Sequence, residues 1–207
     1  KLGRFVASLR VSPQTAASDL GPLQNEPQLR IVERHVSDAK ERGARVVCGG
    51  EPTGKGFGYR PTVLDRCTHE MTVMREETFG PVLAVMRVKD AEEALKLAND
   101  SSYGLNGSVW TRDIARGAAL ARRLSVGVAL VNNHSITGIL PETPWTGVKD
   151  TGPGIASSRH AYLTFTRPRT VFVDTSSKPD PWWMPADDNL RAFGEACPGR
   201  QPPPHGS

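Results

Sequence analysis

Apolar and polar residues follow two different periods through the middle of the chain. Residues 81–88 are almost continuously apolar, which predicts a strand covered on both faces. Residues 107–111 and 126–131 predict two further strands. Between the strands, apolar residues recur at helical spacing in two segments that begin at the capping residues Asp90 and Asp113. The order strand, helix, strand, helix, strand predicts an α/β fold with a parallel sheet and right-handed crossovers.

The N-terminal part predicts one longer helix. Asn25 is suited to cap it, Pro27 falls in its first turn, and Gly43 stands where a left-handed C-terminal cap belongs. The apolar face of this helix carries Leu29, Val32, Val36 and Ala39. Residues 45–48 then predict a strand, a glycine-rich surface loop follows, and residues 59–64 are expected to be extended.

The C-terminal part is less regular. Residues 132–161 are rich in Gly, Pro, Ser and Thr, and an ordered loop of that length is often functional. Residues 167–174 alternate in a way that suits a strand at the edge of a sheet. We therefore divide the chain into a main domain at 1–166, an edge-strand segment at 167–181, and an aromatic segment with a disordered tail at 182–207.

Composition limits the possible partners of the protein. The 207 residues carry a formal net charge of +4 with scattered basic side chains, so nucleic-acid binding is not expected. Three cysteines without C-x-x-C spacing favour reduced thiols in a cytoplasmic protein. The five histidines show no metal-ligand spacing, so we expect no metal. No run approaches the roughly 18 apolar residues of a membrane span, so we expect no membrane association.

Residues just before the apolar strand carry the clearest chemical signal. In an extended segment Glu77 and Phe79 point to one side, while Glu76 and Thr78 point to the other. A carboxylate can accept hydrogen bonds from two vicinal hydroxyls, and a ring can stack on a flat heterocycle. The pair Glu77 and Phe79 therefore suits a nucleoside. From spacing alone an alternative stays open, in which Glu77 pairs with a basic side chain and Phe79 belongs to the core.

Several motifs in order resemble the aldehyde dehydrogenase superfamily. In that family E-E-x-F-G-P-V is followed by a helix, by Y-G-L and by a strand V-W/F-T-x-D, and residues 75–113 contain E-E-T-F-G-P-V, Y-G-L and V-W-T-R-D. Further similar segments lie at 19–50, 58–65, 126–133 and 144–154. The resemblance implies a parallel-sheet catalytic domain of aldehyde dehydrogenase type, which oxidises a small-molecule aldehyde to a carboxylic acid with NAD or NADP. It also implies that Glu77 holds the nicotinamide ribose and that Phe79 contacts the nicotinamide.

The same resemblance implies that essential parts lie outside this chain. Family members attack the aldehyde with a cysteine thiolate, and that cysteine and the Rossmann-type domain lie further upstream of the E-E-x-F-G-P motif than Lys1. Neither Cys48, Cys67 nor Cys197 has an evident activating partner, so we assign no catalytic residue. We expect the C-terminal portion of an aldehyde dehydrogenase, inactive by itself. The alternative is a truncated, non-catalytic remnant that serves as an oligomerisation or partner-binding module.

Two more residues and one segment follow from the resemblance. The loop 132–145 corresponds to the wall of the aldehyde tunnel, which makes Trp145 and His134 candidate substrate-pocket residues. A core aromatic and a hydrogen-bonded loop histidine are the respective alternatives. The segment 167–181 corresponds to a strand that family members use in assembly, so we expect a homo-oligomer when the protein is full length. Neither the aldehyde nor the choice between NAD and NADP follows from these residues.

Overall fold

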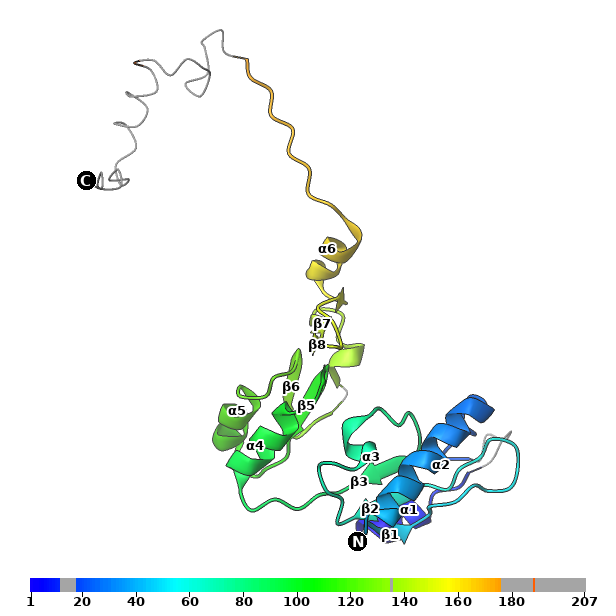
Figure 1. The fold of residues 1–207 in the computed structure, drawn as a ribbon. Coiled ribbons are helices and arrows are strands. Elements are labelled where there is room, and N and C mark those ends of the chain that lie inside the picture. The colour runs from blue at the N-terminus through cyan, green and yellow to red at the C-terminus, as the bar shows by residue number, and fades with distance from the viewer. Residues whose placement is uncertain (12–17, 135, 176–187, 189–207) are drawn as a thin grey trace, which may run out of the picture. The chain divides into compact units, whose positions relative to one another are not determined.

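The computed structural model describes residues 1–11, 18–134, 136–175 and 188. The chain forms two compact units, Lys1–Thr166 and Arg167–Ser207. All of the helices and strands described below belong to the first unit, and Figure 1 shows their order. Cys197 and most of the aromatic segment predicted at 182–207 lie outside the described residues.

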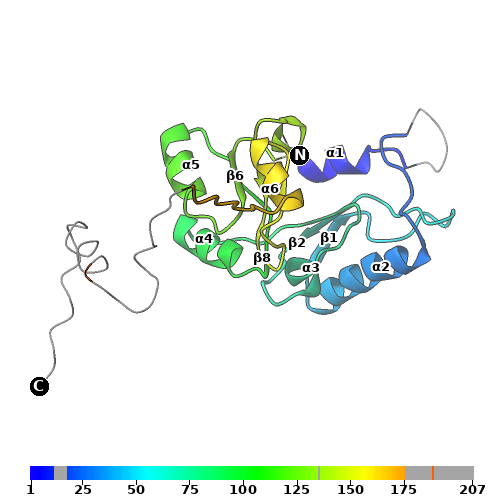
Figure 2. The ribbon, with the colours of Figure 1, turned by 90° about the horizontal axis from the view of Figure 1, so that it is seen from above.

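A three-stranded sheet organises the N-terminal half of this unit. Its elements are α1 (Leu2–Ala7), α2 (Glu26–Glu41), β1 (Arg45–Cys48), β2 (Thr62–Asp65), α3 (Thr72–Arg75) and β3 (Val82–Ala84). The strand order is β1-β2-β3, with β1 antiparallel and β3 parallel to the central β2. Helices α1 and α2 lie on opposite faces of this sheet (Figure 2).

The hydrophobic core lies between α2 and the sheet. The apolar face of α2 contributes Val32, Val36 and Ala39, and fully buried Leu64 and Met71 pack against them. The helix starts where the sequence predicts, because the Asn25 side chain accepts a hydrogen bond from the backbone N–H of Gln28. It ends before Gly43, whose φ of 93° is the left-handed conformation expected after a helix.

The C-terminal half contains shorter strands. Its elements are α4 (Ala91–Asn99), β4 (Tyr103–Gly104), β5 (Asn106–Val109), α5 (Ile114–Ala121), β6 (Val128–Val131), η1 (Ile136–Ile139), β7 (Trp145–Thr146), β8 (Val148–Lys149), β9 (Ile155–Ala156), η2 (Arg159–Ala161) and α6 (Tyr162–Phe165). Strands β5 and β6 are parallel and α5 connects them, which is the expected βαβ unit. The predicted caps are confirmed, since Asp90 and Asp113 accept hydrogen bonds from the N–H groups of Glu93 and Arg116.

The three strands predicted at 81–88, 107–111 and 126–131 do not share one parallel sheet within the part of the chain that the structure describes. Strand β3 covers only Val82–Ala84 and pairs with β2, whereas β5 pairs with β6 in a separate sheet. Every residue of β2 is buried, so its backbone groups need a hydrogen-bonded neighbour on both sides. Strand β3 supplies the second neighbour. Hydrophobic spacing identifies a buried strand but does not identify the strand beside it.

The edge strand expected in 167–174 is also not observed. These residues pair with no strand in the described ranges, and Val171, Phe172 and Val173 are 71%, 84% and 72% exposed. A strand is stable only when a neighbouring strand pairs with its backbone, and no such strand pairing is present within 167–175. In those described ranges no helix has the length and apolar character to cross a membrane.

Candidate functional site

Glu77 and Phe79 lie in the irregular segment that joins α3 to β3. The Glu77 side chain is exposed and makes no hydrogen bond or ion pair with any described residue. The ring of Phe79 is 76% exposed. The alternative in which Glu77 pairs with a basic residue and Phe79 enters the core is therefore not observed. Both side chains are available to a ligand.

The intervening residues face helix α2. Buried His35 lies with Nε2 3.2 Å from Oε2 of Glu76 and with Nδ1 3.1 Å from Oγ1 of Thr78. Arg34 adds a weaker ion pair to Glu76, at 3.8 Å. Glu76 and Thr78 thus turn toward the protein, as the alternation predicts, and Glu77 between them turns toward solvent.

Phe79 has an unusual backbone conformation. Its φ of 42° lies in the left-handed region, which a bulky residue adopts only when its surroundings hold it there. The side-chain amide of Gln28 holds it by donating to the carbonyls of Thr78 and Phe79, at 2.7 and 3.3 Å. The next residue, Gly80, packs so closely on α2 that a Cβ would lie 2.5 Å from Cγ2 of Val32. Helix α2 consequently holds the segment in place.

Sequence reasoning missed the contributions of Gln28 and His35. A signal was present, because positions 28, 32 and 35 fall on one side of a helix and include two polar residues next to an apolar stripe. A buried polar side chain needs hydrogen-bond partners, and such a pattern therefore indicates a contact with another segment. The pattern does not indicate which segment.

Glu77 also lines a cavity of about 310 Å³. Its other lining residues come from α4 and from the strands and loops that follow it: Ala98, Ser101, Tyr103, Gly104, Leu105, Asn106, Gly107, Leu124, Val126 and Thr151. Phe79 is not among them. The carboxylate of Glu77 is the one acidic group of the set. The cavity therefore presents hydroxyl groups and apolar surface around a single anionic acceptor.

The two predicted substrate-pocket residues have different surroundings. Trp145 lines a second cavity of about 310 Å³, which shares Leu105 and Thr151 with the cavity beside Glu77. The two cavities are thus neighbours. His134 is exposed and lines neither of them; its backbone N–H donates to Oδ1 of Asn133. Trp145 thus lines a cavity next to the one that Glu77 lines, whereas His134 lines neither cavity.

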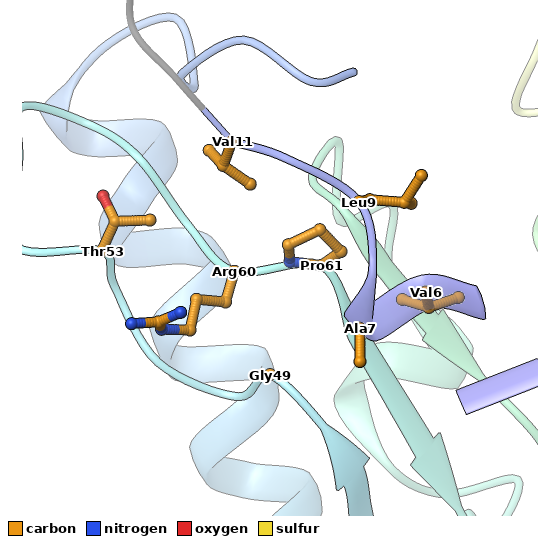
Figure 3. Close-up of a pocket in the computed structure, with 8 residues that line it drawn as sticks. All are labelled: Val6, Ala7, Leu9, Val11, Gly49, Thr53, Arg60 and Pro61. Atoms are coloured by element: carbon orange, nitrogen blue, oxygen red, sulfur yellow. The ribbon is translucent and has the colours of Figure 1, made fainter. Parts of the chain in front are cut away.

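A third cavity, of about 320 Å³, lies between the C-terminal end of α1, with the segment that follows it, and the loop that joins β1 to β2 (Figure 3). It contains none of the predicted site residues and is lined by Val6, Ala7, Leu9, Val11, Gly49, Thr53, Arg60 and Pro61. Arg60 is its only charged residue, and its Nε lies 3.1 Å from a carboxylate oxygen of Glu51. With this charge already paired, the cavity presents no group suited to catalysis.

The cysteines that the structure describes are not activated nucleophiles. Burial raises the pKa of the Cys67 thiol, which keeps it protonated and unreactive. Cys48 is half-buried at the end of β1, with Sγ 3.8 Å from the carbonyl oxygen of Pro61. Within the described ranges, no three His, Cys, Asp or Glu residues come together in a way that could hold a metal ion.

The chain is similar in sequence to known proteins of one family. Residues 1–171 match the model of the aldehyde dehydrogenase family. The chain is 39% identical over 162 residues to an aldehyde dehydrogenase of Paenarthrobacter nicotinovorans, covering 78% of this chain and 35% of that protein. It is 39% identical over 182 residues to the NADP(+) succinate-semialdehyde dehydrogenase of Deinococcus radiodurans, covering 86% and 38%.

A solved structure shows the same relationship. The fold matches the aldehyde dehydrogenase of Mycobacterium tuberculosis complexed with NAD+, with a TM-score of 0.76 at 36% identity, over 85% of this chain and 37% of that one. The chain therefore spans little more than a third of the length of these relatives. Over the part that it spans, sequence and fold agree, and the chain belongs to the aldehyde dehydrogenase family.

Proposed function

We propose that this chain supplies the nicotinamide side of the cofactor site in an enzyme that oxidises an aldehyde to a carboxylic acid with NAD(P)+. The observation that carries the proposal is the exposed, unpartnered pair Glu77 and Phe79 on a segment that α2 holds in place. NAD(P)+ supplies the hydride acceptor of such a reaction. This chain contributes binding and orientation, and the relatives crystallised with NAD+ support the choice of ligand.

The chemistry of both residues fits a nicotinamide riboside. An ionised carboxylate only accepts hydrogen bonds, and its two oxygens match the two vicinal hydroxyls of a ribose. Glu77 meets this requirement because no cation of the described chain competes for it. The exposed ring of Phe79 offers a flat apolar surface to a heterocycle. Its strained backbone supports a role in ligand binding, because such conformations cluster at ligand-binding positions.

We assign the aldehyde side to the loop that ends in Trp145. Its cavity adjoins the one that Glu77 lines, which supports a common site for aldehyde and nicotinamide. His134 stays a weaker candidate, since it lines neither cavity in the isolated chain. The cysteine thiolate that forms the thioester is proposed to come from a part of the protein upstream of this chain. We therefore expect the 207-residue chain alone not to oxidise aldehydes.

Turnover measurements test that expectation. The purified chain is incubated with NAD+ or NADP+ and a simple aliphatic aldehyde, and formation of the reduced nicotinamide is followed by absorbance. No turnover is expected. Turnover that disappears on replacing Cys48 or Cys67 with Ala would overturn the assignment of the nucleophile.

Ligand titration tests the cofactor site. We expect NAD+ and nicotinamide mononucleotide to shift the NMR signals of Glu77 and Phe79, with weak affinity because the chain offers no predicted adenosine site. AMP serves as the control ligand and should leave these signals unchanged. Nicotinamide-dependent shifts confined to other residues would contradict the proposal.

A second candidate function is an assembly module without catalysis. The observation that favours it is the run of exposed apolar residues in the second unit, Val171, Phe172 and Val173, at 71%, 84% and 72% exposed. Apolar side chains exposed in such a row indicate a surface that a partner covers. We propose that 167–181 forms a strand with a second copy of the protein. Sedimentation of the chain with and without Phe172→Asp tests this, and a monomer in both cases would contradict it.

A further inference from the structure

One side of helix α2 contacts every residue of 76–80 that is not directed to solvent. Gln28 donates to the carbonyls of Thr78 and Phe79, and Val32 packs on Gly80. One turn further along, His35 meets the side chains of Glu76 and Thr78. These contacts belong to a helix that lies more than forty residues earlier in the chain, so they are made only in the folded protein.

Among these α2 residues, His35 contacts two side chains of the segment. It is fully buried, and each ring nitrogen lies within hydrogen-bond distance of one side chain from the segment. An ionised Glu76 can only accept, so Nε2 of His35 carries the proton of that bond. Nδ1 is then free to accept from the hydroxyl of Thr78. One rigid ring thus satisfies two residues spaced two apart.

That spacing determines what the rest of the segment can do. Side chains at 76 and 78 that turn toward α2 leave the side chain of Glu77 directed away from it. Glu77 then lines its cavity, while the Phe79 ring stays exposed. We propose that His35 is the positioning residue of the cofactor site, acting through Glu76 and Thr78. The inference rests on the proposed function of Glu77 and Phe79.

The test separates positioning from general stability. His35→Phe keeps a buried ring but removes both hydrogen bonds. His35→Gln can keep the bond to Glu76, and His35→Asn can keep the bond to Thr78. Val36→Ala is the control, because Val36 is equally buried in the next position of α2 and is not among the residues that bond to 76–80. Thr78→Val removes the hydroxyl that bonds to Nδ1 of His35, and it leaves the buried side chains of α2 unchanged.

Two readouts are compared across these variants of the 207-residue chain. Backbone 15N relaxation reports the order of the amides at 77–79, and titration reports the dissociation constant for nicotinamide mononucleotide. For His35→Phe we expect order parameters at 77–79 to fall below about 0.6, with the rest of the chain unchanged. We expect its affinity to fall about ten-fold, with His35→Gln, His35→Asn and Thr78→Val in between.

The outcomes distinguish the two proposals. The positioning role would be overturned if His35→Phe and Thr78→Val kept both the amide order at 77–79 and the affinity for nicotinamide mononucleotide of the unchanged chain. So would a loss in Val36→Ala equal to that in His35→Phe. If the unchanged chain fails to bind nicotinamide mononucleotide while His35→Phe and Thr78→Val still disorder 77–79, the positioning role stands and the proposed cofactor site fails. An Nε2-protonated imidazole in the 15N spectrum, retained in Thr78→Val because Glu76 still accepts from Nε2, is the expected spectroscopic signature.

Discussion

The side-chain amide of Gln28 lies 3.3 Å from the carbonyl oxygen of Phe79, a residue whose backbone has a φ of 42°. A residue from a regular helix thus holds a strained conformation in the segment before β3. For a residue with a Cβ, the left-handed region costs roughly 1–2 kcal/mol. The side chain at this strained position contributes little to the core, since Phe79 is 76% exposed.

Replacement of Phe79 by Gly should therefore stabilise the fold. Glycine adopts φ of 42° freely, and the gain exceeds the roughly 0.4–1 kcal/mol that glycine loses through the greater entropy of the unfolded chain. We expect a net gain of about 0.5–1 kcal/mol in the free energy of unfolding, measured by urea denaturation. Glu77→Gly is the matched control, because Glu77 is an exposed neighbour without positive φ, and it should lose stability. A loss for Phe79→Gly as large as for Glu77→Gly would contradict the strain.

The adjacent glutamates should respond differently to the same change. Glu77→Ala removes a carboxylate that no described residue contacts, so stability should hold within about 0.5 kcal/mol while affinity for nicotinamide mononucleotide falls at least about ten-fold. Glu76→Ala removes the acceptor at Nε2 of His35 and should lower stability by about 1–2 kcal/mol. Thermal unfolding and ligand titration of both variants check this. Equal stability losses in the two would contradict the division of roles.

Acid should weaken the contact between α2 and α3. The backbone N–H of Thr72 donates to Oδ2 of Asp38 at 2.8 Å, which holds the pKa of Asp38 below its ordinary value of 3.8. Partial burial opposes this shift, and Arg42, with Nε 2.6 Å from Oδ1, adds to it. Because the folded pKa lies below the unfolded one, the stabilisation is complete above pH 3.8 and is lost as the pH falls through the folded value.

The variant Asp38→Asn measures that contribution. It should be less stable than the unchanged chain at about pH 6, and the difference should shrink as the pH approaches about 3. Urea unfolding at several pH values checks the prediction. A difference that is the same at every pH would show that Asp38 acts only through uncharged hydrogen bonds.

Gly127 should tolerate no larger side chain. A Cβ there would lie 1.8 Å from the carbonyl oxygen of Thr146, which is backbone and cannot move aside cheaply. Gly127→Ala should lower the free energy of unfolding by about 3 kcal/mol and displace the neighbouring Trp145 from its cavity. Tryptophan fluorescence and thermal unfolding report the two effects. At Gly138 a Cβ meets nothing within 4 Å, so Gly138→Ala should be neutral or stabilising by about 0.5 kcal/mol.

Local features of this fold were accessible from the sequence. Asn25, Asp90 and Asp113 cap their helices as predicted, because a capping bond joins residues only three apart. The direction of Glu76 and Thr78 toward the protein followed from the alternation of an extended chain. The motifs around residues 76–82 also led to the family to which the chain belongs.

The partners of these elements were not accessible. Strand β3 pairs with β2 and not with β5, and residues 167–174 pair with no strand in the described ranges. The buried His35 fell on a helix that the pattern marked only by its apolar residues. For β3 and for His35 the deciding contact joins residues far apart along the chain, and many such contacts satisfy the same local pattern.

The sequence by itself determined where helices begin, which residues alternate around Glu77 and which family the chain resembles, because each depends on neighbours a few residues apart. Only the tertiary structure decided that α2 holds the segment of Glu77 and Phe79 through Gln28 and His35. It also decided that the ring of Phe79 stays exposed on a strained backbone. The physical reason is that burial and long-range hydrogen bonds exist only once the chain has folded on itself.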